Sequence, residues 1–196
     1  MNEHAKRSSN RFELSDLFFR GERTALFIDG ANLYCAAKGL GFDIDFRLLR
    51  QEFGRCGKMI RAYYYTAILE NDDYSALRPL TDWLVYNGYT LISKPAREYT
   101  DGFGRRKIKG NMDVELTVDA LELAPRIEHA VLFSGDGDFR PLVEALQRQG
   151  VRVTVVSTML TQPTMVSDDL RRQADHFIEL DFLRQVIGRP PREHAA

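Results

Sequence analysis

Cysteine is scarce in this chain, and long apolar runs are absent. Only Cys35 and Cys56 occur among 196 residues, so neither a disulfide framework nor a cysteine-ligated zinc site is expected, and each cysteine is expected to pack as a small apolar residue. No run approaches the ~18–20 apolar residues that span a bilayer. Residues 1–10 lack the apolar core of a signal peptide. The sequence therefore predicts a cytoplasmic protein without a membrane partner.

An excess of charge of one sign is missing too. The formal net charge is −1, from 27 Lys and Arg against 28 Asp and Glu, so any surface for nucleic acid must come from local clustering. The four histidines are scattered, without metal-ligand spacing. We expect one domain over residues 24–183. An N-terminal extension over 1–23 and a disordered tail over 184–196 would flank it.

Short apolar runs alternate with helical patterns along the chain. We expect strands at 24–28, 59–68, 89–93, 130–133, 151–156 and 177–180, and helices at 30–38, 46–53, 75–87, 111–124, 139–149 and 168–174. Asp45 is the predicted N-cap of the second helix. Residues 94–110 are interpreted as irregular, with a turn at 101–104. The alternation predicts an α/β fold, in which helices cover both faces of a mainly parallel sheet.

Apolar runs that end in aspartate are the most informative feature. Asp29 follows the first predicted strand, and Asp136 and Asp138 follow the strand at 130–133. Asp113 lies in the first turn of the helix that leads into that strand. Because the carboxyl ends of parallel strands share one edge of the sheet, the four acids should face the same rim. Carboxylates gathered there repel one another unless a divalent cation neutralises them.

Three of these acids also have a purely structural interpretation. Asp113 could complement a helix macrodipole, and Asp136 and Asp138 could form a capped turn. Asp119 lies about 9 Å further along the same helix axis and is a weaker candidate. The convergence of four acids favours a functional site. Without clustered His or Cys, carboxylates favour Mg²⁺ or Mn²⁺, and the fitting reaction is metal-assisted hydrolysis of a phosphodiester with the aspartates as metal ligands.

The neighbourhood of these acids suggests a polyanionic substrate. Asn32 could orient a water, and Ser134 could bond a ligand or phosphate. Six basic residues stand against two acidic ones just before Asp113: Lys94, Arg97, Arg105, Arg106, Lys107 and Lys109. A flexible basic loop beside an acidic site suits RNA, and Tyr99 and Phe103 could stack on unpaired bases. A loop that is merely solvated is the alternative.

Three motifs together resemble the NYN domain family, and within it the LabA-like bacterial branch that is related to PIN-domain nucleases. They are FIDGANL at 27–33, KGNMDV at 109–114 and LFSGDGDF at 132–139, in the family's order, and the similarity covers about residues 24–181. The resemblance implies a PIN-like three-layer α/β/α sandwich and a divalent-metal-dependent ribonuclease. Its acidic site would be Asp29, Asp113, Asp136 and Asp138, and Asn32 matches the asparagine of the first motif.

Two functions of different classes follow. The first is a ribonuclease that uses Mg²⁺ or Mn²⁺ on single-stranded or structured RNA, with endonucleolytic cleavage favoured. The alternative is a regulatory module that binds RNA or protein and keeps the acids without appreciable turnover. A haloacid-dehalogenase-like phosphatase fits less well, because Ala31 stands where it would have a second acid. A phosphate loop of the form Gly-x-x-x-x-Gly-Lys is lacking.

The apolar segment at 12–19 predicts an amphipathic helix in the N-terminal extension. Its apolar face could cover its own domain, or it could pack on a second copy of the chain in a homodimer. We favour the first arrangement.

Overall fold

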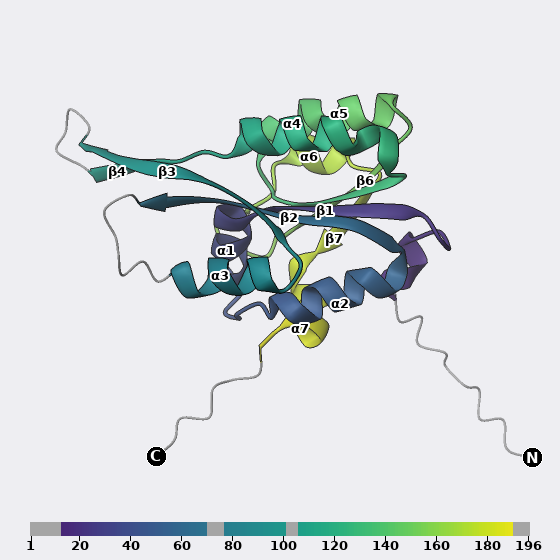
Figure 1. The fold of residues 1–196 in the computed structure, drawn as a ribbon, viewed down its shortest axis with the longest axis horizontal. Helices are drawn as coiled ribbons and strands as arrows, with labels where there is room; N and C mark the ends of the chain where they lie inside the picture. Colours follow the sequence, from purple (N-terminus) through teal and green to yellow (C-terminus); the bar gives the residue numbers. More distant parts are fainter. Residues whose placement is uncertain (1–12, 70–76, 101–105, 190–196) are drawn as a thin grey trace, which may run out of the picture.

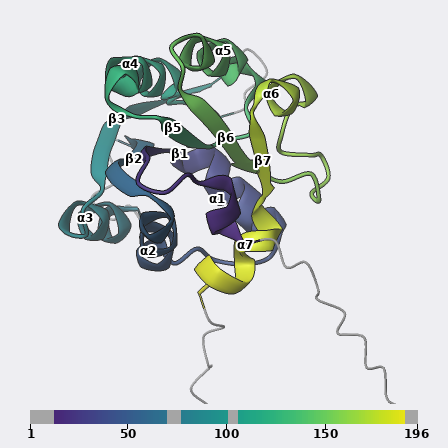
Figure 2. The ribbon, with the colours of Figure 1, turned by 90° about the vertical axis from the view of Figure 1, so that its right-hand side faces the viewer.

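The computed structural model describes residues 13–69, 77–100 and 106–189. Within them a seven-stranded sheet lies between two layers of helices (Figures 1 and 2). The strand order is β4-β3-β2-β1-β5-β6-β7, with parallel pairing throughout except between β3 and β4. The predicted α/β/α sandwich with a mainly parallel sheet is therefore confirmed.

The strands are β1 Arg23–Asp29, β2 Lys58–Leu69, β3 Thr90–Thr100, β4 Arg106–Lys109, β5 His129–Phe133, β6 Arg152–Ser157 and β7 His176–Glu179. The helices are α1 Gly30–Gly39, α2 Phe46–Cys56, α3 Arg78–Tyr86, α4 Asp113–Leu123, α5 Arg140–Arg148, α6 Asp168–Gln173 and α7 Leu180–Ile187. Three short 3₁₀ turns are η1 Leu14–Leu17, η2 Ala124–Arg126 and η3 Gly137–Phe139.

The central strand β1 is apolar from Ala25 to Ile28, where both of its faces are covered. Ala25 and Phe27 pack with α4, α5 and α6 in one core, whereas Leu26 and Ile28 pack with α1, α2, α3 and α7 in the other. Successive side chains of a strand point to opposite faces, so a strand buried on both sides needs apolar residues at every position. This continuous run is what makes β1 recognisable in the sequence.

Local signals set two of the helix ends, one of which, the Asp45 cap, is predicted above. The Asp45 side chain accepts hydrogen bonds from the backbone N–H groups of Arg47 and Leu48, at 2.9 and 3.1 Å, and so caps α2. Gly150 follows α5 with a φ of +81°, a conformation that glycine adopts without strain. The helix expected at 75–87 corresponds to α3, and residues 75–76 lie outside the described residues.

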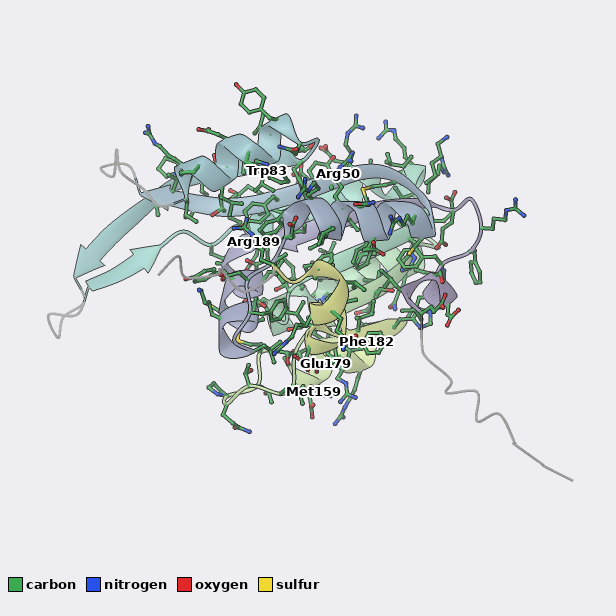
Figure 3. All side chains as sticks on the ribbon, turned by 90° about the horizontal axis from the view of Figure 1, so that it is seen from below. Arg50, Trp83, Met159, Glu179, Phe182 and Arg189 are labelled. Carbon is green, nitrogen blue, oxygen red and sulfur yellow. The ribbon has the colours of Figure 1, made fainter. Side chains whose placement is uncertain are left out.

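The prediction of an irregular segment at 94–110 is wrong. Strand β3 continues to Thr100, and β4 returns antiparallel to it, with Arg97 opposite Lys109 and Tyr99 opposite Lys107. Figures 1 and 3 show this pair of strands projecting beyond the rest of the sheet, and we call it the β3–β4 arm. Charged residues are as typical of an exposed edge strand as of a loop, which explains the error. The turn expected at 101–104 lies outside the described residues.

Both ends of the described chain pack on the domain. Residues 14–17 form a 3₁₀ turn, and the following Phe18 is buried with its ring 6.1 Å from Phe53 and 4.7 Å from His129. The segment thus covers its own domain. Phe12 lies outside the described residues. A homodimer stays a prediction. Helix α7 runs past residue 183 and buries Ile187 in the core that α1, α2 and α3 form on their face of the sheet.

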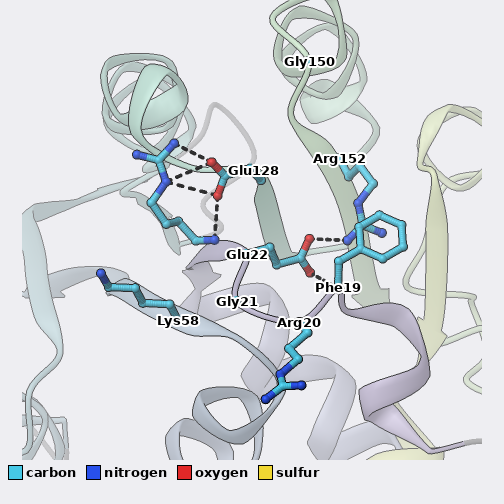
Figure 4. A pocket seen from close by; sticks show the side chains of 9 residues that line it. Phe19, Arg20, Gly21, Glu22, Lys58, Glu128, Gly150 and Arg152 are labelled. Carbon is cyan, nitrogen blue, oxygen red and sulfur yellow. Dashed lines mark hydrogen bonds and ion pairs between the residues drawn. The ribbon is translucent and has the colours of Figure 1, made fainter.

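A charged cluster closes the amino edge of the sheet (Figure 4). The buried Glu22 carboxylate pairs with Arg152 and contacts His129 Nδ1 at 3.0 Å, and Arg23 pairs with Glu128. The His129 Nε2 atom lies 2.7 Å from Thr154 Oγ1. These contacts anchor the N-terminal segment to β5 and β6.

In the part of the chain that the structure describes, every helix is too short or too polar to cross a membrane.

The buried His129 predicts a dependence of stability on pH. Burial lowers the pKa of His129, and nearby Arg152 adds to this against the opposing effect of Glu22. As the pH falls through about 6.5, the unfolded chain therefore takes up a proton more readily than the folded one, and the free energy of unfolding decreases. Urea unfolding at pH 7 and pH 5.5 should show a smaller decrease for His129→Gln than for wild type. Equal decreases would contradict this assignment.

Candidate metal centre

The candidate site lies where the order of the strands reverses. From β1 the chain places β2 and β3 on one side and β5, β6 and β7 on the other. Such a switch point leaves a crevice at the carboxyl ends of the two central strands, where ligands bind in doubly wound folds. Asp29 is the last residue of β1, and Ser134 directly follows β5. Both strands thus deliver polar residues to this crevice.

Three of the four predicted acids come together there. One carboxylate oxygen from each of Asp113, Asp136 and Asp138 lies within 4.8 Å of the others, and we call these residues the three-acid group. Asp113 is the first residue of α4, Asp136 precedes η3 and Asp138 lies within it. The shared rim expected from the topology is therefore present for these three residues.

Asp29 is linked to the three-acid group without belonging to it. Its Oδ1 accepts a hydrogen bond from the Asn32 backbone N–H at 3.1 Å. Its Oδ2 accepts one from the Ser134 hydroxyl at 3.1 Å. The Ser134 Oγ in turn accepts from the Asp136 backbone N–H at 3.2 Å. Both carboxylate oxygens of Asp29 thus have partners within the protein, and one of them leads to the loop that carries Asp136.

Asn32, in the first turn of α1, makes a second connection to the loop that carries Asp136. Its Oδ1 accepts a hydrogen bond from the Gly135 backbone N–H at 3.0 Å. Ser134, which we expected to bond a ligand, is 1% exposed and bonds Asp29 instead. In this structure Asn32 and Ser134 fix the loop that carries Asp136 and Asp138 to the end of β1 and the start of α1.

Asp29 and Asp113 are held in surroundings that disfavour their charge. Burial raises the pKa of Asp29, and the charges of Asp113 and Asp136 add to this, against hydrogen bonds from Asn32 and Ser134. Burial also raises the pKa of Asp113. Because a divalent cation would relieve this repulsion, and hard carboxylate oxygens are the ligands that Mg²⁺ and Mn²⁺ prefer, the residues present fit such an ion.

Asn111 is a site residue that our sequence analysis missed. Its Oδ1 accepts a hydrogen bond from the Asp113 backbone N–H at 2.7 Å, and its Nδ2 donates to the Asp113 carboxylate. It therefore sets the position of that acid at the start of α4. The Asn-x-Asp spacing within the KGNMDV motif, which is typical of an Asx turn, could have indicated this role.

Other predicted residues lie outside this network. Asp119 accepts a hydrogen bond from the Tyr65 hydroxyl at 3.0 Å and is not in the three-acid group. Lys94 pairs with Glu115 at 2.9 Å, so its charge is compensated. Residues 106–109 form β4 in the arm, and Arg105 lies outside the described residues.

A doubly wound α/β/α sandwich with carboxylates gathered at its switch point defines a PIN-like domain. Residues 23–181 match the NYN domain, which covers most of the chain. The protein belongs to the NYN domain family, which is generally nuclease-like and usually depends on divalent metal ions.

Two relatives support this assignment. The low amplitude and bright protein LabA of Synechococcus elongatus is 34% identical over 178 residues, which cover 89% of this chain and 92% of that protein. The crystal structure of a protein of unknown function from Vibrio parahaemolyticus matches with a TM-score of 0.69 and 29% identity, over 86% of this chain and 97% of the other. The resemblance inferred from the three motifs, including the LabA-like branch, is confirmed.

The tight packing behind Asp136 predicts the effect of a substitution at Gly135. A Cβ atom there would lie 2.1 Å from the Met165 carbonyl oxygen and 2.5 Å from Ser157 Oγ. We expect Gly135→Ala to lower the free energy of unfolding by about 1–3 kcal/mol, as overpacking does.

The matched control is Gly54→Ala in helix α2, where the nearest atom would be 3.9 Å away. It should leave stability unchanged or raise it slightly, by up to about 1 kcal/mol. Chemical denaturation of the two variants and wild type measures both effects. If Gly135→Ala were as stable as Gly54→Ala, the close packing of this loop would be refuted.

Proposed function

We propose that this protein is a ribonuclease that hydrolyses RNA phosphodiester bonds with Mg²⁺ or Mn²⁺ in the cytoplasm, most simply as an endonuclease. The observation that carries the proposal is the three-acid group at the switch point of a nuclease-like fold. Asp113, Asp136 and Asp138 would hold the ion. Asp29, whose pKa responds to the charges of Asp113 and Asp136, adds to the negative potential that attracts it.

The chain's own groups keep this site in place before a substrate arrives. When bound, a divalent ion neutralises phosphate oxygens and acidifies water. Asn111 fixes Asp113, and the backbone N–H of Asp138 donates to the Asp136 carboxylate at 3.0 Å. Ser134 fixes Asp29. Because these bonds exist in the free protein, little reorganisation is needed when charge develops at the phosphate.

The β3–β4 arm supports RNA as the polyanion. Strand β3 is aligned with β1 through β2, so its extension runs in the carboxyl direction, toward the edge where the acids lie. Positions 107 and 109 alternate with position 106 along β4, and alternate positions share a face. We propose that Lys107 and Lys109 contact RNA phosphates from one face of the arm, and Arg106 from the other.

One observation favours the second candidate function. Asp29 caps α1, and Asp136 caps η3, so both acids have local structural roles that do not depend on catalysis. A regulatory module that binds RNA or protein without cleaving it could need the same residues. Cleavage, rather than binding, separates the two functions.

Cleavage should depend on the metal ion and on the three-acid group. With purified protein and a labelled RNA, we expect cleavage in Mg²⁺ or Mn²⁺ that EDTA abolishes. Asp136→Asn should lower the rate by at least about 100-fold, the effect of losing one electrostatic group at a reacting centre. The amide oxygen of the asparagine can still accept the capping hydrogen bond, so the fold should persist.

The matched control is Asp119→Asn, because Asp119 lies on the same helix as Asp113 but bonds Tyr65. It should cleave like wild type. RNA that stays intact in both ions with folded wild type, or a rate unaffected by Asp136→Asn, would refute the ribonuclease and favour the regulatory module.

Binding by the arm should depend on salt. The double variant Lys107→Ala, Lys109→Ala should bind RNA more weakly. The slope of log K against log salt should shrink by about 0.7 for each phosphate of a single strand that the variant no longer neutralises. Lys58→Ala is the control, because Lys58 lies at the start of β2, at the amino edge of the sheet (Figure 4). It should change neither the affinity for RNA nor the salt slope. An unchanged slope in the double variant would exclude the arm from RNA binding.

A further inference from the structure

A pocket adjoins the three-acid group. Its volume is about 460 Å³, and it is lined by Gly137, Asp138, Arg140, Pro141, Ser167 and Asp169. It shares Asp138 with the three-acid group. A molecule in this pocket would therefore extend to the carboxylates themselves. The pocket lies between the starts of α5 and α6.

The walls of this pocket are built by close packing. A Cβ atom on Gly137 would lie 2.9 Å from Ser167 Oγ, so the two segments approach more closely than most side chains allow. The Ser167 backbone N–H donates to the Gly135 carbonyl at 2.9 Å, and Ser167 Oγ accepts from Leu170 N–H at 3.2 Å. The start of α6 is thus fixed against the loop that carries Asp136 and Asp138.

Arg140 supplies the positive charge of this pocket. Its side chain is 48% exposed and has a loose ion pair with Glu144, at 3.7 Å. An arginine at the first position of α5 gains nothing from the helix macrodipole, which favours anions there. The guanidinium is a good ligand for phosphate, because its planar fork can donate two hydrogen bonds.

Asp169 supplies an acceptor on the other helix. Among the described residues it has no ion pair or hydrogen-bonded side-chain partner, whereas the adjacent Asp168 pairs with Arg172 at 3.3 Å and does not line the pocket. A carboxylate beside a phosphate-binding arginine suits a ligand that carries both an anion and a hydroxyl donor. A ribonucleotide has both.

We propose that this pocket binds the nucleotide next to the scissile phosphate, with Arg140 on its phosphate and Asp169 on its ribose 2′-hydroxyl. The inference rests on the proposed ribonuclease function and deepens it, because it explains how RNA is held against acids that repel it. It also assigns the choice of RNA over DNA, which differ in this hydroxyl.

Helix α5 offers a matched pair of variants for the phosphate contact. Arg140 and Arg148 both pair with Glu144, from opposite sides along the helix, but Arg140 alone of the two lines the pocket. We expect Arg140→Gln to raise KM for RNA about 10-fold, with kcat changed less than about 2-fold. Arg148→Gln should match wild type. Equal KM values for the two variants would overturn the phosphate contact.

The ribose contact is tested with two oligonucleotides that differ by one 2′-deoxy substitution beside the cleaved bond. Wild type and the control Asp168→Ala should have a KM about 5-fold or more higher for the deoxy substrate, the effect of losing one hydrogen bond to a charged group. Asp169→Ala should treat the two substrates alike. Discrimination that persists in Asp169→Ala would overturn this contact.

Failure of this inference is distinguishable from failure of the proposed function. If wild type leaves RNA intact, the ribonuclease is refuted, and the pocket is then judged by the dissociation constant for a short RNA in Mg²⁺. About 10-fold weaker binding by Arg140→Gln than by Arg148→Gln would support the pocket, and equal binding would overturn it. Matching thermal unfolding of the two variants excludes a folding defect as the cause.

Discussion

Two hydrogen bonds join the ends of β1 and β5, and the candidate site depends on both. The Ser134 hydroxyl donates to Asp29, and the Gly135 backbone N–H donates to Asn32. Through them the loop that carries Asp136 and Asp138 is held against the start of α1, although like charges tend to drive these segments apart. Within the described residues, four helices cover one face of the sheet and three cover the other, and this framework keeps the two strand ends adjacent.

The structural roles of Asp29 and Asp136 are compatible with the chemical role proposed for the site. Asp29 and Asp136 accept hydrogen bonds from backbone N–H groups that follow them in the chain. These hydrogen bonds do not neutralise the carboxylates, which still contribute negative potential to the crevice. The capped turn expected at Asp136 is therefore present, and this structural role does not compete with a role in binding a cation. Capping fixes the direction of the carboxylate, and a fixed direction is what a binding site for an ion needs.

Most of the fold could be predicted from the sequence, because short apolar runs mark the central strands β1 and β5, and each of these runs is followed by a polar residue. The placement of Asp113, Asp136 and Asp138 on one rim followed from the parallel topology alone. Asp29 also lies at this edge, at the end of β1. Its absence from the three-acid group could not be predicted, because it depends on the hydrogen bonds that its side chain accepts from Asn32 and Ser134. The β3–β4 arm escaped prediction because charged residues suit edge strands and loops alike. The pocket beside Arg140 could not be predicted, because it depends on how α6 packs against the loop after β5. No pattern in the local sequence indicates that packing.

The central claim is that the three-acid group binds a divalent cation. Anomalous diffraction from crystals of the wild-type protein grown with Mn²⁺ tests it most directly. We expect a manganese peak coordinated by oxygens of Asp113, Asp136 and Asp138, and its loss in Asp136→Asn crystals grown in the same way. Well-ordered carboxylates without a peak between them at saturating Mn²⁺, or a peak only elsewhere on the protein, would contradict the account.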